Sequence, residues 1–320
     1  MLGATAGAVC LFPVFVLVTG IWDVVRFRWQ MPSVRLFCFI VQYMVNDSVE
    51  ILLAAPLRLA AGCGFVSESR ASRMRYERLQ AWSIRILVRR ARQLLGIRLD
   101  IDPAAIDALC PGPAIVLCHH VSALDAALPS LLYQTIGFHS RGVIMAELLA
   151  DPGFDLIYRH TGSVFVARDN DPGSRARVAQ IARDLDARTV AVIFPEGRLF
   201  RPQVLQDALA RLRERDPKRA ARLADLKHVL PPRPGGVNAL LDNAPEADVV
   251  LIKHGFAPYA TLAELARQVP LEHSIAVEVR RVRHVDIPVD HDARVKWLDG
   301  IWIDLDDWIH DHQRGATSVP

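Results

Sequence analysis

Hydrophobic and polar positions divide the chain into an apolar N-terminal part and a longer part in which short apolar runs alternate with amphipathic ones. Residues 2–22 carry no charged side chain, and a helix of about 20 residues matches the hydrocarbon core of a bilayer. Pro13 lies inside this run, where a membrane helix tolerates proline better than a soluble helix does. Because no basic residue precedes the run, as it would in a signal peptide, we predict an uncleaved membrane helix.

A second apolar stretch, residues 36–61, is interrupted by Asp47 and Glu50. Charges at the middle of a bilayer are costly, which favours an interfacial or re-entrant segment over a second full span. Eight arginines follow between Arg70 and Arg92, with apolar residues at near-helical spacing between them. This pattern is typical of an amphipathic helix on an anionic membrane surface, although an ordinary solvated helix has the same pattern.

Short apolar runs bounded by turn residues replace these long stretches after about residue 98. They predict strands at residues 114–118, 142–145, 163–167, 189–194, 249–253 and 274–282, with helices at residues 122–132, 174–187 and 208–226. Strands that alternate with helices indicate a layered α/β domain with a largely parallel central sheet. We therefore predict two parts: residues 1–97 as a membrane helix, an interfacial segment and a basic amphipathic helix, and residues 98–314 as the α/β domain.

Composition narrows the range of partners. The net charge is only +3, but arginine greatly outnumbers lysine and is clustered, which points to an anionic membrane surface, a phosphate ligand or nucleic acid. Nucleic acid is the weakest of these, because the motifs of nucleic-acid-binding modules are missing. The five cysteines show no C-x-x-C spacing, so neither a disulfide framework nor a zinc site is indicated.

The strongest candidate for chemistry follows the predicted strand at residues 114–118. Ser122 and Asp125 fit the S-x-x-D capping box at the start of a helix, so that Asp125 can reach back toward His120. A neutral histidine held by a carboxylate is a stronger base than a free one and could take a proton from an alcohol. Such a pair is half of a Ser-His-Asp triad, with the substrate's hydroxyl in place of the serine. The alternative is a plain helix cap beside two surface histidines.

Two further strand ends carry polar residues. Arg168 follows the predicted strand at residues 163–167, and the forked guanidinium of arginine suits phosphate. In Phe194-Pro-Glu196-Gly197-Arg198, a tight turn carries a carboxylate and an arginine, and glycine lets backbone amides approach a phosphate. Taken singly, these features could equally be a salt-bridging arginine and an ordinary turn. Cys118, beside the histidines, is expected to pack in the core instead of acting as a nucleophile.

Taken together and in this order, the three segments resemble the first three signature blocks of the lysophosphatidic acid acyltransferases, a family of the glycerolipid acyltransferase superfamily. The resemblance covers about residues 95–285. Leu230-Pro-Pro-Arg233 and the stretch Trp297–Trp302 resemble the lysocardiolipin acyltransferase-like branch. Two departures stand out. His119 occupies the place where the family usually has asparagine, and Arg198 follows Gly197 where the family continues Gly-Thr-Arg, so that the family's arginine is displaced by one place or replaced by Arg201.

The resemblance implies an α/β acyltransferase domain at a membrane face, with acyl-CoA or acyl carrier protein as donor. It also implies that His120 is the general base, that Asp125 orients it, and that the fourth block lies near Pro232 and Arg233, close to the donor or the acyl chain. The implied binding residues for the acceptor's glycerol phosphate are Arg168, Glu196 and Gly197, with Arg198 and Arg201 as candidates beside them. Backbone amides near the helix start at Ser122 are candidates for stabilising the oxyanion or another negative group.

No metal or cofactor is predicted, because a thioester is already activated. The Asp and His residues at 304–312 fit an amphipathic helix with an acidic outer face better than a metal site. No G-x-S-x-G elbow supports a hydrolase.

The predicted function is a membrane-bound enzyme that esterifies 1-acylglycerol-3-phosphate to phosphatidic acid. The alternatives are another acceptor, such as lysocardiolipin or lysophosphatidylglycerol, and a non-catalytic lipid-binding protein. We expect the bilayer, the lysophospholipid and the acyl donor as partners, and no nucleic acid. A bacterial inner membrane, with the catalytic domain facing the cytoplasm, fits the Arg- and Ala-rich composition.

Overall fold

The computed structural model describes residues 2–60, 70–122, 125–167, 173–257, 262–271 and 274–317. The chain forms two compact units. The first comprises Met1–Arg98, Ala146–Ser163 and Thr261–Ser274, and the second comprises Leu99–Met145, Val164–Ala260 and Ile275–Pro320. The first unit therefore includes Ala146–Ser163 and Thr261–Ser274, which were predicted to belong to the α/β domain at residues 98–314.

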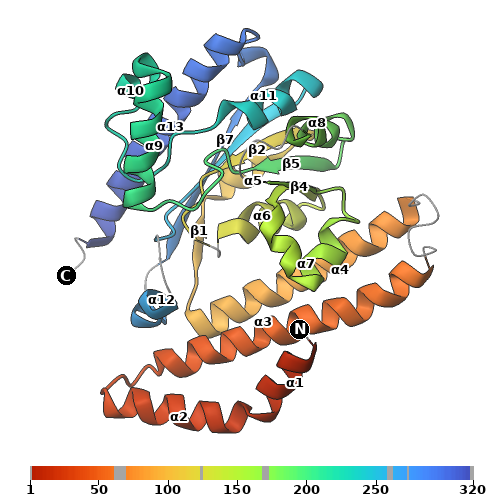
Figure 1. Ribbon diagram of the computed structural model, residues 1–320, viewed down its shortest axis with the longest axis vertical. Helices are drawn as coiled ribbons and strands as arrows, with labels where there is room; N and C mark the ends of the chain where they lie inside the picture. Colours follow the sequence, from red (N-terminus) through yellow and green to blue (C-terminus); the bar gives the residue numbers. More distant parts are fainter. Residues whose placement is uncertain are drawn as a thin grey trace. The chain divides into compact units, whose positions relative to one another are not determined.

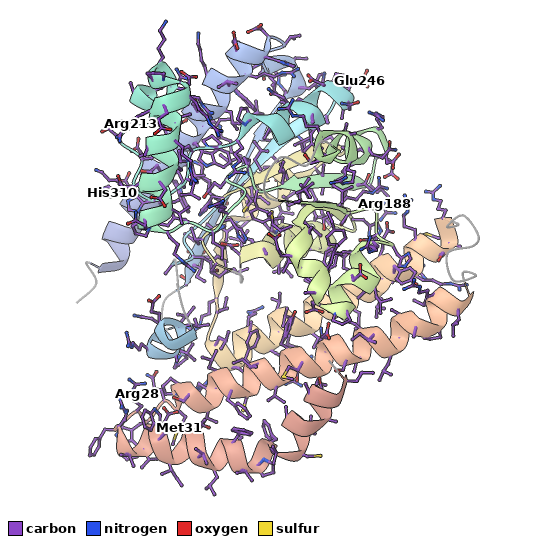
Figure 2. The ribbon with its side chains drawn as sticks, in the orientation of Figure 1. Arg28, Met31, Arg188, Arg213, Glu246 and His310 are labelled. Carbon is purple, nitrogen blue, oxygen red and sulfur yellow. The ribbon has the colours of Figure 1, made fainter. Side chains whose placement is uncertain are left out.

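The first unit is helical in its described parts. Its helices are α1 (Leu2–Cys10), α2 (Phe12–Val25), α3 (Pro32–Ala60), α4 (Arg70–Arg90), α7 (Pro152–Tyr158) and α12 (Leu262–Gln268), and a π-helical turn (Ala91–Leu95) continues α4. Figure 1 shows α2, α3 and α4 side by side, with α7 against the same group. Figure 2 labels Arg28 and Met31 at the turn that joins α2 to α3.

The N-terminal apolar run is not the single helix that its sequence predicts. It breaks at Leu11 into α1 and α2, which are bent by 61°. Pro13 explains the break, because proline lacks an amide donor and fits the first turn of a helix better than its interior. The second apolar stretch is instead one continuous helix, and Pro32–Leu59 is the described helix that is by itself long and apolar enough to cross a membrane.

Buried polar side chains of α2 and α3 make hydrogen bonds within the first unit. Buried Asp23 of α2 accepts hydrogen bonds from the amides of Ser33 (2.9 Å) and Val34 (3.3 Å) and so caps the start of α3. Farther along α3, buried Asn46 donates to Glu50 Oε1 (2.9 Å) and to Ser83 Oγ of α4 (2.7 Å). Next to this band, Ala54, Tyr76, Leu79 and Ile157 form an apolar cluster between α3, α4 and α7.

The second unit is built on a seven-stranded sheet in the order β1-β7-β6-β2-β5-β3-β4. The strands are β1 (Leu99–Ile101), β2 (Ala114–Cys118), β3 (His139–Met145), β4 (Val164–Val166), β5 (Thr189–Ile193), β6 (Asp248–His254) and β7 (Ile275–Val282). Every pair of neighbours is parallel except β6 with β7. The predicted α/β class with a largely parallel sheet is confirmed, and β2 and β5 are buried at every position, as expected for central strands covered on both faces.

Helices accompany this sheet (Figure 1): α5 (Pro103–Leu109), α6 (Leu128–Thr135), α8 (Ser174–Arg183), α9 (Pro202–Arg215), α10 (Pro217–Arg222), α11 (Pro234–Asn243) and α13 (His291–Thr317). The range predicted as one helix, residues 208–226, is helical but is divided between α9 and α10. Asp216 ends α9, and its side chain accepts from the Arg219 amide (3.0 Å) to cap α10, while Pro217 begins α10. Arg213, labelled in Figure 2, lies in the last turn of α9.

The C-terminal helix is fixed by acids on its inner face. Asp299 of α13 is fully buried and accepts hydrogen bonds from both Arg219 (2.7 Å) and Arg222 (2.6 Å). Asp306 accepts from the amides of Lys227, His228 and Val229. The predicted acidic outer face at residues 304–312 is confirmed for Asp304, Asp307 and Asp311, which are exposed, but not for Asp306, which is buried and anchors the helix to the loop at residues 227–229.

Candidate active site

The candidate site lies where three neighbouring parallel strands end. Cys118, the last residue of β2, pairs with Ile252 of β6, and Leu117 pairs with Ile193 of β5. The segments that follow these strands therefore emerge at the same edge of the sheet, which is where ligands bind in open α/β sheets. His119 and His120 follow β2, Phe194 follows β5, and His254 ends β6.

His120 and Asp125 form the predicted pair. His120 Nδ1 lies 2.6 Å from Asp125 Oδ1. The amides of Val121 (2.7 Å) and Ser122 (2.9 Å) both donate to Asp125 Oδ2, so the reach-back bond of the S-x-x-D pattern is confirmed. The helix itself begins later than predicted, as a 3₁₀ turn at Asp125–Ala127 followed by α6. The contact is possible because the chain turns between strand and helix.

This arrangement sets the protonation of the histidine ring. An ionised carboxylate can only accept hydrogen bonds, so His120 Nδ1 carries the proton and Nε2 is left as the basic atom. Asp125 is 0% exposed, whereas the His120 side chain is 22% exposed. The buried carboxylate thus orients a ring whose edge remains accessible, which is the geometry that a general base requires.

The amides of Val121 and Ser122, two of the candidates for stabilising an oxyanion, are already engaged. Val121 and Ser122 both direct their N–H groups at Asp125 Oδ2. An amide that already donates to a carboxylate is not available to a developing negative charge on the substrate. Ser122 therefore contributes to the site by fixing Asp125, through its backbone.

The turn after β5 holds the backbone of His120. The Gly197 amide donates to Phe194 O (3.0 Å), and Gly197 has φ = 65°, in the left-handed region that favours glycine. The Phe200 amide donates to His120 O (2.7 Å), and the Phe194 ring lies 4.6 Å from the His120 ring. The base is thereby clamped between its own turn and the turn of the neighbouring strand.

Glu196 is a buried residue of the same turn after β5. It is 2% exposed, and the Leu230 amide donates to its Oε2 (3.2 Å). Burial raises the pKa of the Glu196 carboxyl well above its ordinary value, while hydrogen bonding from the Leu230 and His120 amides and from Trp302 acts in the opposite direction. The carboxyl links three segments of the unit, and its contact with an acceptor, which the family resemblance implies, stays a prediction.

Arginines surround this turn. The exposed Arg233 side chain lies over Gly197, since a Cβ at Gly197 would be 3.5 Å from Arg233 Cδ, and the Arg233 amide donates to Pro195 O (2.8 Å). Arg198 and Arg201, both half-buried, lie on the turn itself. The structure therefore brings Gly197 and Arg233 together, although they are far apart in sequence. Arg168 lies outside the described residues.

Sequence reasoning missed His254. Its ring stacks on His119 with 3.8 Å between centroids, and its Nε2 lies 3.2 Å from His119 O and 3.8 Å from Asp125 Oδ2. Burial lowers the pKa of both histidines, that of His119 well below its ordinary value. A single histidine at the end of a predicted strand carries no local signal, and only the pairing of β2 with β6 shows what it contacts.

Cys118, His119 and His254 are the one group in the described part of the chain whose ligand atoms could converge on a metal ion. The two imidazole planes differ by only 21° and are stacked, so their nitrogen lone pairs run in near-parallel planes and do not meet at a common point. Burial also raises the pKa of the Cys118 thiol well above its ordinary value, which disfavours the thiolate that a metal needs. The three residues do not fit a metal site.

Comparison with known proteins agrees with this geometry. Residues 103–251 match the model of a family described as Acyltransferase. The crystal structure of the 1-acyl-sn-glycerophosphate (LPA) acyltransferase PlsC from Thermotoga maritima is similar, with a TM-score of 0.53 and 13% sequence identity over 88% of this chain and 98% of that chain. At this identity the likeness concerns the fold. No curated protein sequence matches the chain significantly.

Proposed function

We propose, from the match of residues 103–251 to the acyltransferase family model, that this chain moves a fatty acyl group from a thioester donor to the free hydroxyl of a lysophospholipid. That match agrees with the resemblance seen in the sequence. The observation that carries the proposal is the His120–Asp125 pair, in which a buried carboxylate orients a partly exposed imidazole at the end of β2.

The proposed reaction is direct transfer. His120 Nε2 takes the proton of the acceptor hydroxyl while the oxygen attacks the thioester carbonyl, and Asp125 stabilises the imidazolium that forms. When the C–S bond breaks, the thiolate leaves with the proton from His120, so that the base is regenerated. The donor would be acyl-CoA or acyl carrier protein, used as a co-substrate, with no metal or cofactor in the reaction.

The acceptor is proposed to bind through its phosphate at the turn after β5. Arg233 lies over Gly197, and Arg198 and Arg201 are on the same turn, whose Phe200 amide donates to His120 O; these arginines supply positive charge for the phosphate. We include Arg168 in this binding site from the family resemblance. The proposed acceptor is 1-acylglycerol-3-phosphate, with lysocardiolipin and lysophosphatidylglycerol as alternatives. The similar fold of the LPA acyltransferase supports the choice of 1-acylglycerol-3-phosphate as the first candidate.

We further propose that the first unit associates with a membrane. Large apolar side chains of α2 are more than half exposed: Val14, Leu17, Val18, Ile21, Trp22 and Val25. Such a contiguous exposed apolar face is typical of a surface that is covered by lipid. The arginines of α4, most of them exposed, suit anionic head groups. An inner membrane with the catalytic unit on the cytoplasmic side is the proposed location.

Acyl transfer from radiolabelled oleoyl-CoA tests the function. Membranes containing the wild type or His120→Ala are supplied with a panel of lysophospholipids, and the products are separated. We expect label in one diacyl product with the wild type only. Label released as free oleate would instead indicate a hydrolase. Absence of product with both oleoyl-CoA and oleoyl carrier protein would contradict the proposed function.

A further inference from the structure

His254 occupies a buried position directly behind the proposed catalytic pair. It is the last residue of β6 and is 0% exposed. Its Nε2 lies 3.2 Å from His119 O, in the residue that precedes the base, and 3.8 Å from Asp125 Oδ2. One ring atom therefore faces both the backbone that carries His120 and the carboxylate that orients it.

The partners of the His254 ring fix its tautomer. The Phe256 amide donates to His254 Nδ1 (3.4 Å), so that Nδ1 must be unprotonated. The His119 carbonyl can only accept, so the hydrogen is on Nε2. The positive end of the Nε2–H bond consequently points at the His119 carbonyl and toward the Asp125 carboxylate.

Burial keeps the His254 ring neutral, and the stacked His119 ring packs against it. The titratable groups that face His254 are Asp125, His119, His120 and Cys118. Burial is the main reason that the pKa of His254 is lowered, and the Asp125 charge acts against it. The stacked His119 ring, whose pKa is also lowered, fills the space beside it. His119 stands where the resembled family usually has asparagine, so the stacked pair distinguishes this chain from that pattern.

We propose that His254 is a positioning residue for acyl transfer: its Nε2–H holds the His119 carbonyl and faces Asp125, and thereby keeps His120 aligned. The inference rests on the proposed function, because alignment of the base has meaning only for a reaction that uses it. Loss of this donor removes a positive dipole that faces the Asp125 carboxylate, so positive charge beside Asp125 is stabilised more strongly and activity is expected to need a higher pH.

Two amide substitutions separate this role from packing. His254→Gln keeps a donor near the position of Nε2, whereas His254→Asn has an amide that reaches only the position of Nδ1. We expect His254→Asn to lower kcat by about 10- to 100-fold and to move the acid limb of kcat/KM to higher pH. His254→Gln should stay within about threefold of wild type with an unchanged profile. His312→Gln, a substitution at an exposed histidine of α13, serves as the matched control.

A second measurement does not depend on turnover. In the full chain labelled with ¹⁵N-histidine, His254 should remain the neutral Nε2–H tautomer from pH 8 to pH 5.5, identified by loss of its signals in His254→Gln. A ring that is protonated on Nδ1, or that titrates near its ordinary pKa, overturns the proposal.

The outcomes also distinguish this inference from the proposed function. Equal loss of kcat in both amide variants with an unchanged pH profile would reduce His254 to a packing residue. Wild-type activity in His254→Asn would likewise overturn the inference while leaving the function intact. A wild type that transfers no acyl group to any acceptor overturns the function and the positioning role together.

Discussion

The two units bury carboxyl groups in different ways. In the first unit, buried Asn46 donates to Glu50 and to Ser83, so that these hydrogen bonds join side chains of α3 and α4. In the second unit, Asp125 is fully buried, and its hydrogen bonds lead outward to a histidine that is partly exposed. Burial of a charge alone therefore does not mark a functional site; what matters is whether its network ends at an accessible reactive atom.

The largest effect is expected at the end of that network. His120→Ala and Asp125→Asn should each lower kcat/KM for acyl transfer by about 10³-fold, because a positioned general base contributes on the order of 10²–10⁴. Asp125→Asn should also lower the thermal unfolding midpoint, since it replaces a carboxylate that accepts from two backbone amides. Retention of a tenth of the activity by Asp125→Asn would mean that the carboxylate is only a helix cap.

The next largest effect concerns the phosphate contact. Arg233→Ala should raise KM for the lysophospholipid acceptor by about 10-fold, in line with about 1.5–3 kcal/mol for a hydrogen bond to a charged group. The KM for the thioester donor should change less than twofold. Arg213→Ala, at another exposed arginine, is the control and should change neither constant. Equal loss for both substrates would contradict the assignment of Arg233 to the acceptor.

A smaller effect is expected from the Asn46 hydrogen bonds of the first unit. Asn46→Ala should destabilise the protein by about 1–3 kcal/mol, because Glu50 and Ser83 lose a buried partner. Activity per folded molecule should be unchanged. Denaturant unfolding of Asn46→Ala, Ser83→Ala and the double variant measures the coupling, which we expect to be about 1 kcal/mol. A loss of kcat in Asn46→Ala would show that the hydrogen bonds of the first unit also serve catalysis.

The smallest expected effect is a pH dependence of stability. The folded-state pKa of His119 is lowered by burial, so the unfolded chain binds an extra proton below about pH 6.5. Its contribution to stability is therefore complete above pH 6.5 and is lost as the pH falls below that value. Replacing His119 by Asn should reduce the fall in unfolding free energy between pH 6.5 and 5.5 by about 1 kcal/mol. Glu196, whose pKa is raised, acts in the opposite direction but is common to both proteins. An unchanged fall in His119→Asn would contradict a neutral buried ring.

The features that depend on residues close together in the sequence were predicted correctly. The strand before His119 and the reach of Asp125 to His120 follow from periodicity and from a capping box of four residues. Six of the seven strands were predicted from apolar runs bounded by turns, whereas β1, with only three residues, is too short to show a period.

Features that depend on distant residues were not predicted. His254 contacts Asp125 only because β6 pairs with β2, and Arg233 lies over Gly197 only because its loop returns to the turn after β5. The errors at Pro13 and Pro217 have a different origin. In each case a proline begins a new helix inside a run that composition alone extends as one helix.

The stacked histidines have a consequence for evolution. Two rings 3.8 Å apart in a closed interior cannot be exchanged independently, since replacing one by a small side chain leaves a void beside the other and removes its partner. A relative with asparagine at position 119 should therefore lack histidine at position 254. A relative with histidine at one of the two positions should have histidine at the other as well. Positions 119 and 254 should vary as a pair among relatives of this chain, while His120 and Asp125 between them stay fixed.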